Sequence, residues 1–267
     1  MNPFADERLL LIMGPCVVEG REITLRIAER LKEITAGLPV NFVFKASFDK
    51  ANRTSGDSFR GIGMQEALAV LDEVRREVGV PVNTDIHEPA HVAEVAQSVD
   101  TLQVPAFLCR QTSLLQAAGA TGKPVFIKKG QFLAPEDMRH QVAKVEGVGG
   151  HGMVALVERG TTFGYANLVV DFRSLPIMRQ YAPVVFDATH SVQRPGGLGD
   201  KSGGDASMVP VLARAAAAVG IDGLFLETHE DPSKALSDGP NMVPLDRLGE
   251  LLEEVVRLHE ASAGRNG

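Results

Sequence analysis

A short loop between Lys45 and Ser55, with the sequence K-A-S-F-D-K-A-N-R-T-S, carries the side chains best suited to bind an anion. It follows a mostly apolar run, Val40 to Phe44, that is typical of a buried β-strand. Arginine offers a planar fork for phosphate or carboxylate, and lysine offers a mobile point charge. The loop therefore indicates an anion site, although a basic loop can also be merely solvated. Its candidate residues are Lys45, Lys50, Asn52, Arg53, Thr54 and Ser55.

Similar side chains follow apolar runs elsewhere in the chain. Lys128 and Arg159 would add two cations to the lysines of the loop, and Gln103 could add a hydrogen bond. Four cations suit a ligand with a phosphate and a carboxylate; the alternative is that some of them form structural ion pairs. Asp85 could be such a partner, or it could bind a hydroxyl or act as an acid–base group. Lys129 should point away from Lys128, because successive side chains alternate along a strand.

A second set of residues could hold a metal ion. Cys16, His190, Glu227 and Asp238 offer a thiolate, an imidazole and two carboxylates. This mixture suits Zn²⁺, Fe²⁺, Mn²⁺ or Co²⁺, whereas an all-oxygen set would have favoured Mg²⁺ or Ca²⁺. No local C-x-x-C or H-x-x-x-H pattern supports the site, and Cys16 could equally be a small buried hydrophobe. Both interpretations stay open on these residues alone.

Short apolar runs alternate with longer amphipathic segments along the whole chain. Strands are predicted at Leu9–Met13, Phe42–Phe44, Pro81–Asp85, Thr101–Val104, Pro124–Ile127, Met153–Val157, Val184–Asp187 and Gly223–Leu226. Helices are predicted at Ile23–Ala36, Met64–Val78, Pro89–Gln97, Thr112–Ala120, Pro135–Val145, Phe172–Tyr181, Pro210–Val219 and Leu245–Ala261. With no Ser- or Pro-rich linker, this pattern predicts one closed (β/α)₈ barrel domain over residues 1–267, with a doubly wound open sheet as the alternative. The lead 1–8 and the tail 262–267 are expected to be flexible.

A barrel would bring the candidate residues together, because its chemistry sits at the C-terminal ends of the strands. The first, seventh and eighth strands would be neighbours, so the four candidate metal ligands could converge. Nearly every predicted strand ends in an ionisable or amide side chain: Cys16, Lys45, Asp85, Gln103, Lys128, Glu158 with Arg159, Asp187 with His190, and Glu227. The loop from Pro195 to Gly204, rich in glycine, is a lid over this mouth, a turn that cradles a phosphate, or an ordinary flexible loop.

The composition narrows the class of protein. The formal net charge of −7 argues against a nucleic-acid partner, which would favour a basic surface. No segment approaches the roughly 18 to 20 apolar residues of a membrane span, and the start M-N-P-F-A-D-E-R lacks a signal-peptide layout. Two cysteines far apart suggest no disulfide framework. We therefore expect a cytoplasmic protein that acts on small molecules.

Several longer segments, taken in order, resemble one enzyme family. They are F-K-A-S-F-D-K-A-N-R-T-S, T-D-I-H-E-P, Q-V-P-A-F-L-C-R-Q-T, K-K-G-Q-F, E-R-G-T-T-F-G-Y, N-L-V-V-D-F-R, D-A-T-H-S-V-Q and A-L-S-D-G-P. Running from Gly14 to about Asp246, they resemble 3-deoxy-D-manno-octulosonate 8-phosphate synthase. The resemblance implies a (β/α)₈ barrel, usually a homotetramer, that condenses phosphoenolpyruvate with D-arabinose 5-phosphate and releases phosphate. The product is the eight-carbon acid sugar of lipopolysaccharide.

The resemblance also implies roles for individual residues. The family has metal-dependent and metal-independent classes, with Cys or Asn after the first strand, and the G-P-C of this chain is similar to the first. Cys16, His190, Glu227 and Asp238 would hold the divalent ion, which could be Zn, Fe, Mn or Co. Phosphoenolpyruvate would lie on Lys45, Lys50, Lys128 and Arg159, with Gln103 and Asp85 nearby and the Ala106 N–H on its phosphate. The expected catalytic residues are Lys45, Lys50, Asp85, Lys128 and His190.

The pentose phosphate would be bound by the loop described first. By resemblance, Asn52, Arg53 and Thr54 grip this phosphate, and Arg53 would reach the site of a neighbouring subunit. Thr54 departs from the family pattern, which usually has Ser there. Because both side chains carry a hydroxyl, only the fine geometry of this contact is affected.

Overall fold

The fold is a closed barrel, seen in a computed structural model that describes residues 2–51, 59–195 and 203–263. Each barrel strand pairs in parallel with the next, and the last pairs with the first, so the alternative of an open sheet is excluded. The predicted (β/α)₈ barrel is therefore confirmed. In order, its strands within the described residues are β1 (Leu9–Gly14), β2 (Val40–Lys45), β3 (Val82–Asp85), β4 (Thr101–Val104), β5 (Val125–Lys128), β6 (Val154–Glu158), β9 (Val184–Asp187) and β12 (Gly223–His229).

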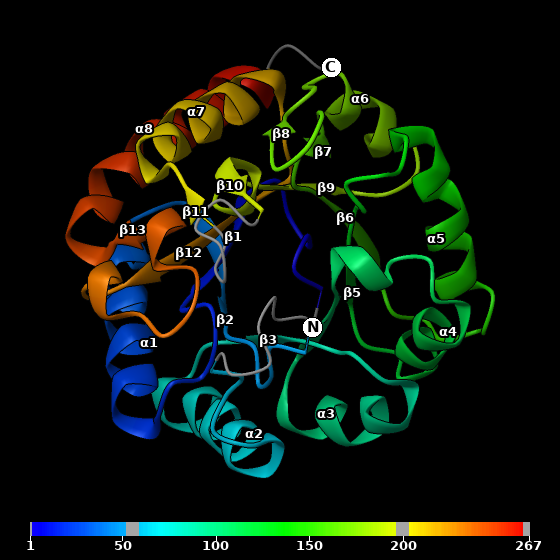
Figure 1. The fold of residues 1–267 in the computed structure, drawn as a ribbon, viewed down its shortest axis with the longest axis horizontal. Helices are drawn as coiled ribbons and strands as arrows, with labels where there is room; N and C mark the ends of the chain where they lie inside the picture. The colour runs from blue at the N-terminus through cyan, green and yellow to red at the C-terminus, as the bar shows by residue number, and fades with distance from the viewer. Residues whose placement is uncertain (1, 52–58, 196–202, 264–267) are drawn as a thin grey trace.

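Helices form a ring around these strands, as Figure 1 shows. They are α1 (Arg21–Thr35), α2 (Met64–Glu73), α3 (Val92–Ser98), α4 (Thr112–Ala120), α5 (Met138–Glu146), α6 (Ser174–Arg179), α7 (Val209–Val219) and α8 (Leu245–Ala263). The predicted helices are all present; α4 has the predicted bounds, and the others have shifted ends. Pro89 and Pro135 open short 3-10 helices ahead of α3 and α5, where a proline needs no N–H partner. The end of α2 continues as a π-helix over Val74–Val78.

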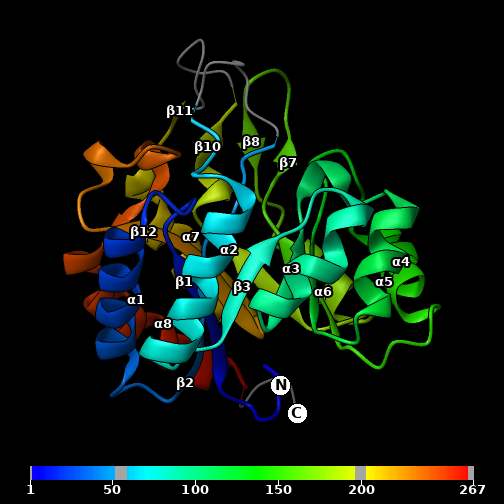
Figure 2. The same cartoon turned by 90° about the horizontal axis from the view of Figure 1, so that it is seen from below.

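The described part of the chain contains five further strands of two residues each, which were not predicted because such short segments show no periodicity. They are β7 (Thr161–Thr162), β8 (Leu168–Val169), β10 (Gln193–Arg194), β11 (Gly203–Gly204) and β13 (Val243–Pro244). The β7–β8 and β10–β11 pairs are antiparallel and project from one end of the barrel, opposite the chain termini (Figure 2). This is the end where the parallel strands finish.

Alternation along the strands separates two apolar layers. In β1, Leu9, Leu11 and Met13 belong to the cluster between strands and helices, while Leu10 and Ile12 belong to the barrel interior. The interior cluster also contains Val43, Phe126, Ala155, Val157, Val185 and Phe225. Phe4 packs against this interior cluster, with its ring centroid 6.2 Å from that of Phe126.

Gly14 ends β1 at a place where no larger residue fits. A Cβ atom there would overlap the carbonyl oxygen of Lys45 on the neighbouring strand. The close approach brings the loop after β1, with Cys16, beside the end of β2. None of the helices within the described residues combines the length and apolarity needed to cross a bilayer. The flexibility predicted for residues 1–8 and 262–267 stays a prediction, and α8 extends two residues beyond its predicted end.

Candidate active site

The barrel mouth is lined by polar side chains that continue the inward-facing positions of the interior. Lys45, for example, lies two residues after Val43, and Lys128 lies two residues after Phe126. The Nζ atoms of Lys45 and Lys128 lie 5.5 and 4.1 Å from the ring centroid of Phe225, an interior residue. Both lysines are buried. The mouth therefore places cations directly above the apolar interior.

On one side of the mouth, Lys45 and Asp85 form the centre of a hydrogen-bonded network. Lys45 Nζ lies 3.2 Å from Asp85 Oδ2 and donates to Ser47 Oγ at 2.9 Å. Lys50 Nζ donates to the same hydroxyl at 3.0 Å, and Gln103 Nε2 donates to Asp85 Oδ1 at 2.6 Å. Burial alone would raise the pKa of Asp85, but the charges of Lys45 and Lys50 outweigh it and hold that pKa well below its ordinary value. Asp85 thus orients Lys45 directly and Lys50 through Ser47, whose hydroxyl donates to Asp85 Oδ2.

On the other side, Asp187 holds both Lys128 and His190. Its Oδ2 lies 2.8 Å from Lys128 Nζ and 2.7 Å from His190 Nδ1. Burial would raise the pKa of Asp187, but His190 and Lys128 lower it far below its ordinary value. A carboxylate on one imidazole nitrogen fixes the ring and leaves the other nitrogen for a ligand. His190 Nε2 lies 3.5 Å from Glu227 Oε1 and 3.9 Å from Asp238 Oδ2.

The candidate metal ligands come together. One atom each of Cys16, Glu227 and Asp238 lies within 4.8 Å of the others, and Cys16 Sγ lies 3.4 Å from Asp238 Oδ2. His190 adjoins two members of this trio. Both carboxylate oxygens of Glu227 are buried without a hydrogen-bond partner in the described part of the chain. Burial and the charge of Glu227 raise the pKa of the Cys16 thiol. A divalent cation would satisfy these groups, so the residues fit a metal site.

Arg159 occupies the mouth beside this trio. Its Nη2 donates to His190 O at 3.1 Å and to Gln193 Oε1 at 2.6 Å. Its Nη1 is buried and has no hydrogen-bond partner within the described residues. Gln193 also donates to Asp238 Oδ2 at 3.3 Å, which links the arginine to the candidate metal ligands. Ala106, another predicted residue, begins the 3-10 helix Ala106–Leu108 directly after β4, where the first N–H groups lack helical partners.

The outcome differs for the remaining predicted residues. Asn52, Arg53 and Thr54 fall outside the described residues, and so does most of the loop from Pro195 to Gly204. Glu158, counted above among the strand-end groups, does not join the mouth but pairs with Lys129. Lys129 faces away from Lys128, as alternation predicted.

Sequence reasoning missed three residues that support the site. Gln193 contacts Arg159 and Asp238, and Ser47 joins two lysines. Ser237 Oγ lies 2.9 Å from Cys16 Sγ. Short polar residues in loops carry no pattern that distinguishes such roles, so only their position next to a motif could have indicated them.

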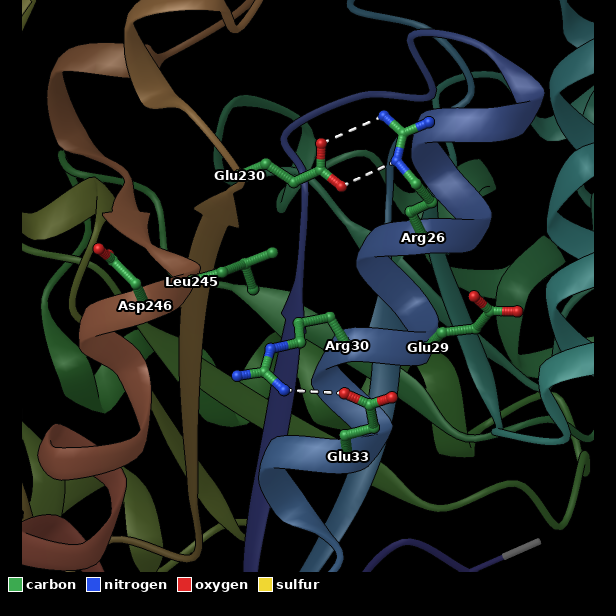
Figure 3. A pocket seen from close by; sticks show the side chains of 7 residues that line it. All are labelled: Arg26, Glu29, Arg30, Glu33, Glu230, Leu245 and Asp246. Atoms are coloured by element: carbon green, nitrogen blue, oxygen red, sulfur yellow. Dashed lines mark hydrogen bonds and ion pairs between the residues drawn. The ribbon is translucent and has the colours of Figure 1, made fainter.

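A recess lies on the outer surface, where α1 approaches the start of α8 (Figure 3). Its two arginines are already paired, Arg26 with Glu230 at 3.0 Å and Arg30 with Glu33 at 2.8 Å. These pairs are largely exposed, so a substrate anion would compete with a neighbouring carboxylate and with water. The recess is lined by Arg26, Glu29, Arg30, Glu33, Glu230, Leu245 and Asp246.

Comparison with known proteins places the chain in a family. The DAHP synthetase I family matches residues 5–263. The chain belongs to this family. A protein of Xanthomonas oryzae pv. oryzae (strain PXO99A) is 61% identical over 254 residues, covering 95% of this chain and 92% of the relative. A protein of Desulfatibacillum aliphaticivorans is 57% identical over 264 residues, covering 98% and 96%.

Both relatives are named 2-dehydro-3-deoxyphosphooctonate aldolase. A relative from Xanthomonas campestris pv. campestris (strain B100), 61% identical over 254 residues, has the same name. This name describes the same eight-carbon phosphate as the resemblance drawn from the motifs, which is thereby confirmed. Membership of the metal-dependent class and the roles of the individual residues stay predictions.

Proposed function

We propose that this protein condenses phosphoenolpyruvate with D-arabinose 5-phosphate and water, giving 3-deoxy-D-manno-octulosonate 8-phosphate and phosphate, for lipopolysaccharide synthesis. The observation that carries this proposal is the 61% identity, over 95% of the chain, to a protein named 2-dehydro-3-deoxyphosphooctonate aldolase. The chemistry of the mouth agrees with it. Both organic substrates are anions, and the mouth gathers cations in a protein whose net charge is −7.

Phosphoenolpyruvate is bound by the buried cations. Arg159 Nη1, without a hydrogen-bond partner within the described residues, donates to its phosphate or carboxylate. Lys128 provides a second charge, held in place by Asp187 at 2.8 Å. Lys45 and Lys50, joined through Ser47, complete the clamp from the other side of the mouth. Ala106 adds its backbone N–H to the phosphate, and Gln103 keeps Asp85 oriented.

The reaction forms one carbon–carbon bond and one carbon–oxygen bond and breaks one carbon–oxygen bond; of the two protons of the water, one goes to the aldehyde oxygen and the other leaves with the phosphate. C3 of phosphoenolpyruvate attacks the aldehyde carbon of the pentose, and the oxygen of water adds to C2. The C2–O bond to the phosphate then breaks, and phosphate leaves with the electron pair. The clamp contributes by fixing the reactants and by stabilising the negative charge that develops.

A divalent ion held by Cys16, His190, Glu227 and Asp238 would act as a Lewis acid that polarises the aldehyde or positions the water. Asp187 fixes the His190 ring for this role through the contact to Nδ1 at 2.7 Å. We further propose that Asn52, Arg53 and Thr54 bind the phosphate of the pentose.

Assembly and location are part of the proposal. Phe107, Phe132, Phe163 and Tyr165 are exposed in the loops after β4, β5 and β6, which supports burial of this end against other copies in a homotetramer. Light scattering of the purified protein tests that state. The free cysteines and phosphorylated substrates support a cytoplasmic enzyme. We also propose that residues 1–267 form one domain, since the barrel extends from β1 to α8.

The test is release of phosphate from phosphoenolpyruvate with arabinose 5-phosphate and, in parallel, with erythrose 4-phosphate. We expect turnover with the pentose and little with the tetrose. Preference for the tetrose would assign the seven-carbon product of a related synthase instead. Sugar binding without phosphate release would indicate a catalytically silent barrel, and hydrolysis without a sugar acceptor would indicate a hydrolase.

A further inference from the structure

A buried ion pair lies behind the mouth, on the outer side of two barrel strands. Lys129 follows the last residue of β5, and Glu158 is the last residue of β6. Lys129 Nζ lies 3.7 Å from Glu158 Oε2, and each side chain is only 1% exposed. Burying two charges costs desolvation free energy. The attraction between the charges and their hydrogen bonds offset this cost only while the contacts are kept. The pair lines no part of the mouth, so substrate binding does not explain it directly.

Lys129 connects the loops that follow β5 and β6. Its Nζ donates to the carbonyl oxygens of Gly130 and Leu133, each at 3.4 Å, in the loop after β5. The same atom donates to Thr161 Oγ1 at 3.1 Å, at the start of the β7–β8 hairpin. A backbone hydrogen bond from Thr162 N to Gln131 O, 3.0 Å long, runs parallel to this link. The ammonium group of Lys129 thus contacts both the loop after β5 and the loop after β6.

Glu158 fixes the second of these loops through its other oxygen. Oε1 accepts a hydrogen bond from Gly160 N at 2.7 Å, and Gly160 has a φ of +89°, which disfavours most other residues. Oε2 has no hydrogen-bond partner within the described residues. Lys129, at 3.7 Å, is therefore the group that offsets its charge.

The residues next to the pair in sequence are the cations of the mouth. Lys128 precedes Lys129 and Arg159 follows Glu158, and both point to the opposite side of their strands. The backbone also links the strand ends, because Lys129 N donates to Val157 O at 2.8 Å. A shift of either strand end would therefore move Lys128 relative to Arg159.

We infer that the Lys129–Glu158 pair is a positioning device that sets the spacing of Lys128 and Arg159 for phosphoenolpyruvate. This inference rests on the proposed function. The pair contacts neither substrate; it acts through the backbone of residues 128–130 and 158–161. Small misplacements of a bound reactant can cost large factors in rate. Loss of the pair should therefore affect phosphoenolpyruvate much more than the pentose, whose phosphate is bound by a different loop.

The first test is Glu158→Gln, which removes the charge but keeps the acceptor for Gly160 N. We expect the KM for phosphoenolpyruvate to rise at least about tenfold while the KM for arabinose 5-phosphate stays within about twofold. Glu158→Asp keeps the charge, and we expect it to restore most of the affinity. The dissociation constant of phosphoenolpyruvate, measured by calorimetry, should follow its KM.

A matched control exists at the opposite end of the barrel. Asp222 pairs with Arg179 at 2.6 Å and accepts a hydrogen bond from Val184 N at 2.7 Å, at the starts of β12 and β9. Like Glu158, it pairs with a cation and accepts a backbone N–H, but this pair is partly exposed and lies at the other end of the strands from the mouth. Asp222→Asn should lower the melting temperature and leave both KM values unchanged.

Because Glu158→Gln leaves Lys129 without a counter-ion, the double variant Lys129→Met/Glu158→Gln accompanies it. If the single variant fails to fold, the double variant should still show the selective rise in KM for phosphoenolpyruvate. Equal changes for both substrates, or no change in a folded variant, would overturn the inference. It would also be overturned if neither variant folds, because the pair would then be purely structural. Absence of turnover in the wild-type protein would instead reject the proposed function. In that case, the dissociation constants of phosphoenolpyruvate measured by calorimetry would still test whether the ion pair positions Lys128 and Arg159.

Discussion

The interior of the barrel and its mouth are built by the same strands, yet one is apolar and the other is charged. In five of the barrel strands within the described residues, the change takes a single step of two residues, from one inward-facing position to the next. In this way Val43 is followed by Lys45, Phe126 by Lys128, Val157 by Arg159, Val185 by Asp187, and Phe225 by Glu227. Alternation thus determines whether a side chain faces the inside of the barrel. Its distance along the strand determines whether it packs in the apolar interior or carries a charge at the mouth.

The two regions should therefore respond oppositely to substitution. In the mouth, Lys128→Ala removes the cation that Asp187 holds at 2.8 Å. We expect a loss of about 3 to 4 kcal/mol of transition-state stabilisation, or roughly 10² to 10³ in kcat/KM, by analogy with the loss of other charge-stabilising groups. Phosphate-release kinetics measure the effect, and urea unfolding checks that stability is retained. Activity equal to wild type would contradict the view that the mouth serves activity and the interior serves stability.

In the interior, Leu10→Ala should do the reverse. Leu10 is fully buried among the inward-facing residues of the barrel. Truncation should cost about 2 to 5 kcal/mol of unfolding free energy, through lost burial and the cavity left behind. Urea unfolding gives this cost. The kcat of the folded fraction should stay within about twofold, and a large drop in kcat at full stability would contradict the division of roles.

A smaller change within the mouth sharpens the comparison. Arg159→Lys keeps the charge but loses the planar fork, whose Nη2 holds Gln193 and His190 and whose Nη1 is available to a ligand. We expect the KM for phosphoenolpyruvate to rise about tenfold, since one charge-assisted hydrogen bond contributes about 1.5 to 3 kcal/mol. Steady-state kinetics with each substrate varied in turn measure this. An unchanged KM would show that Arg159 acts only as a point charge.

The smallest effect is expected in the outer recess of Figure 3. Arg30→Ala removes an exposed partner of Glu33, and such pairs contribute about 0 to 1 kcal/mol. Both kcat and the midpoint of urea unfolding should stay close to wild type. A large loss of activity would mean that charge outside the mouth takes part in the reaction.

The sequence was sufficient to predict the barrel, because eight apolar runs alternate with amphipathic segments and no linker interrupts them. It also predicted that Lys128 and Lys129 face opposite ways, since this follows from strand geometry alone. The family motifs indicated Cys16, Glu227 and Asp238, which the fold brings within 4.8 Å of one another.

The other features of the site depend on contacts and strand register that no local sequence pattern shows. Glu158 and Arg159 are both strand-end charged residues, and only the register of β6 decides which one faces the mouth. Asp187 contacts Lys128, and Gln193 contacts Arg159 and Asp238, all of them distant in sequence. The two-residue strands around the mouth are fixed by pairing rather than by propensity.

The central claim is that the mouth unites a divalent ion with phosphoenolpyruvate and the pentose phosphate. The most direct measurement is phosphate release with both substrates, before and after a chelator, in wild type and in Cys16→Ala, with bound metal determined on the same samples. We predict that the chelator abolishes turnover, that an added divalent ion restores it in wild type, and that Cys16→Ala holds less metal. Full activity in metal-free protein would contradict the account.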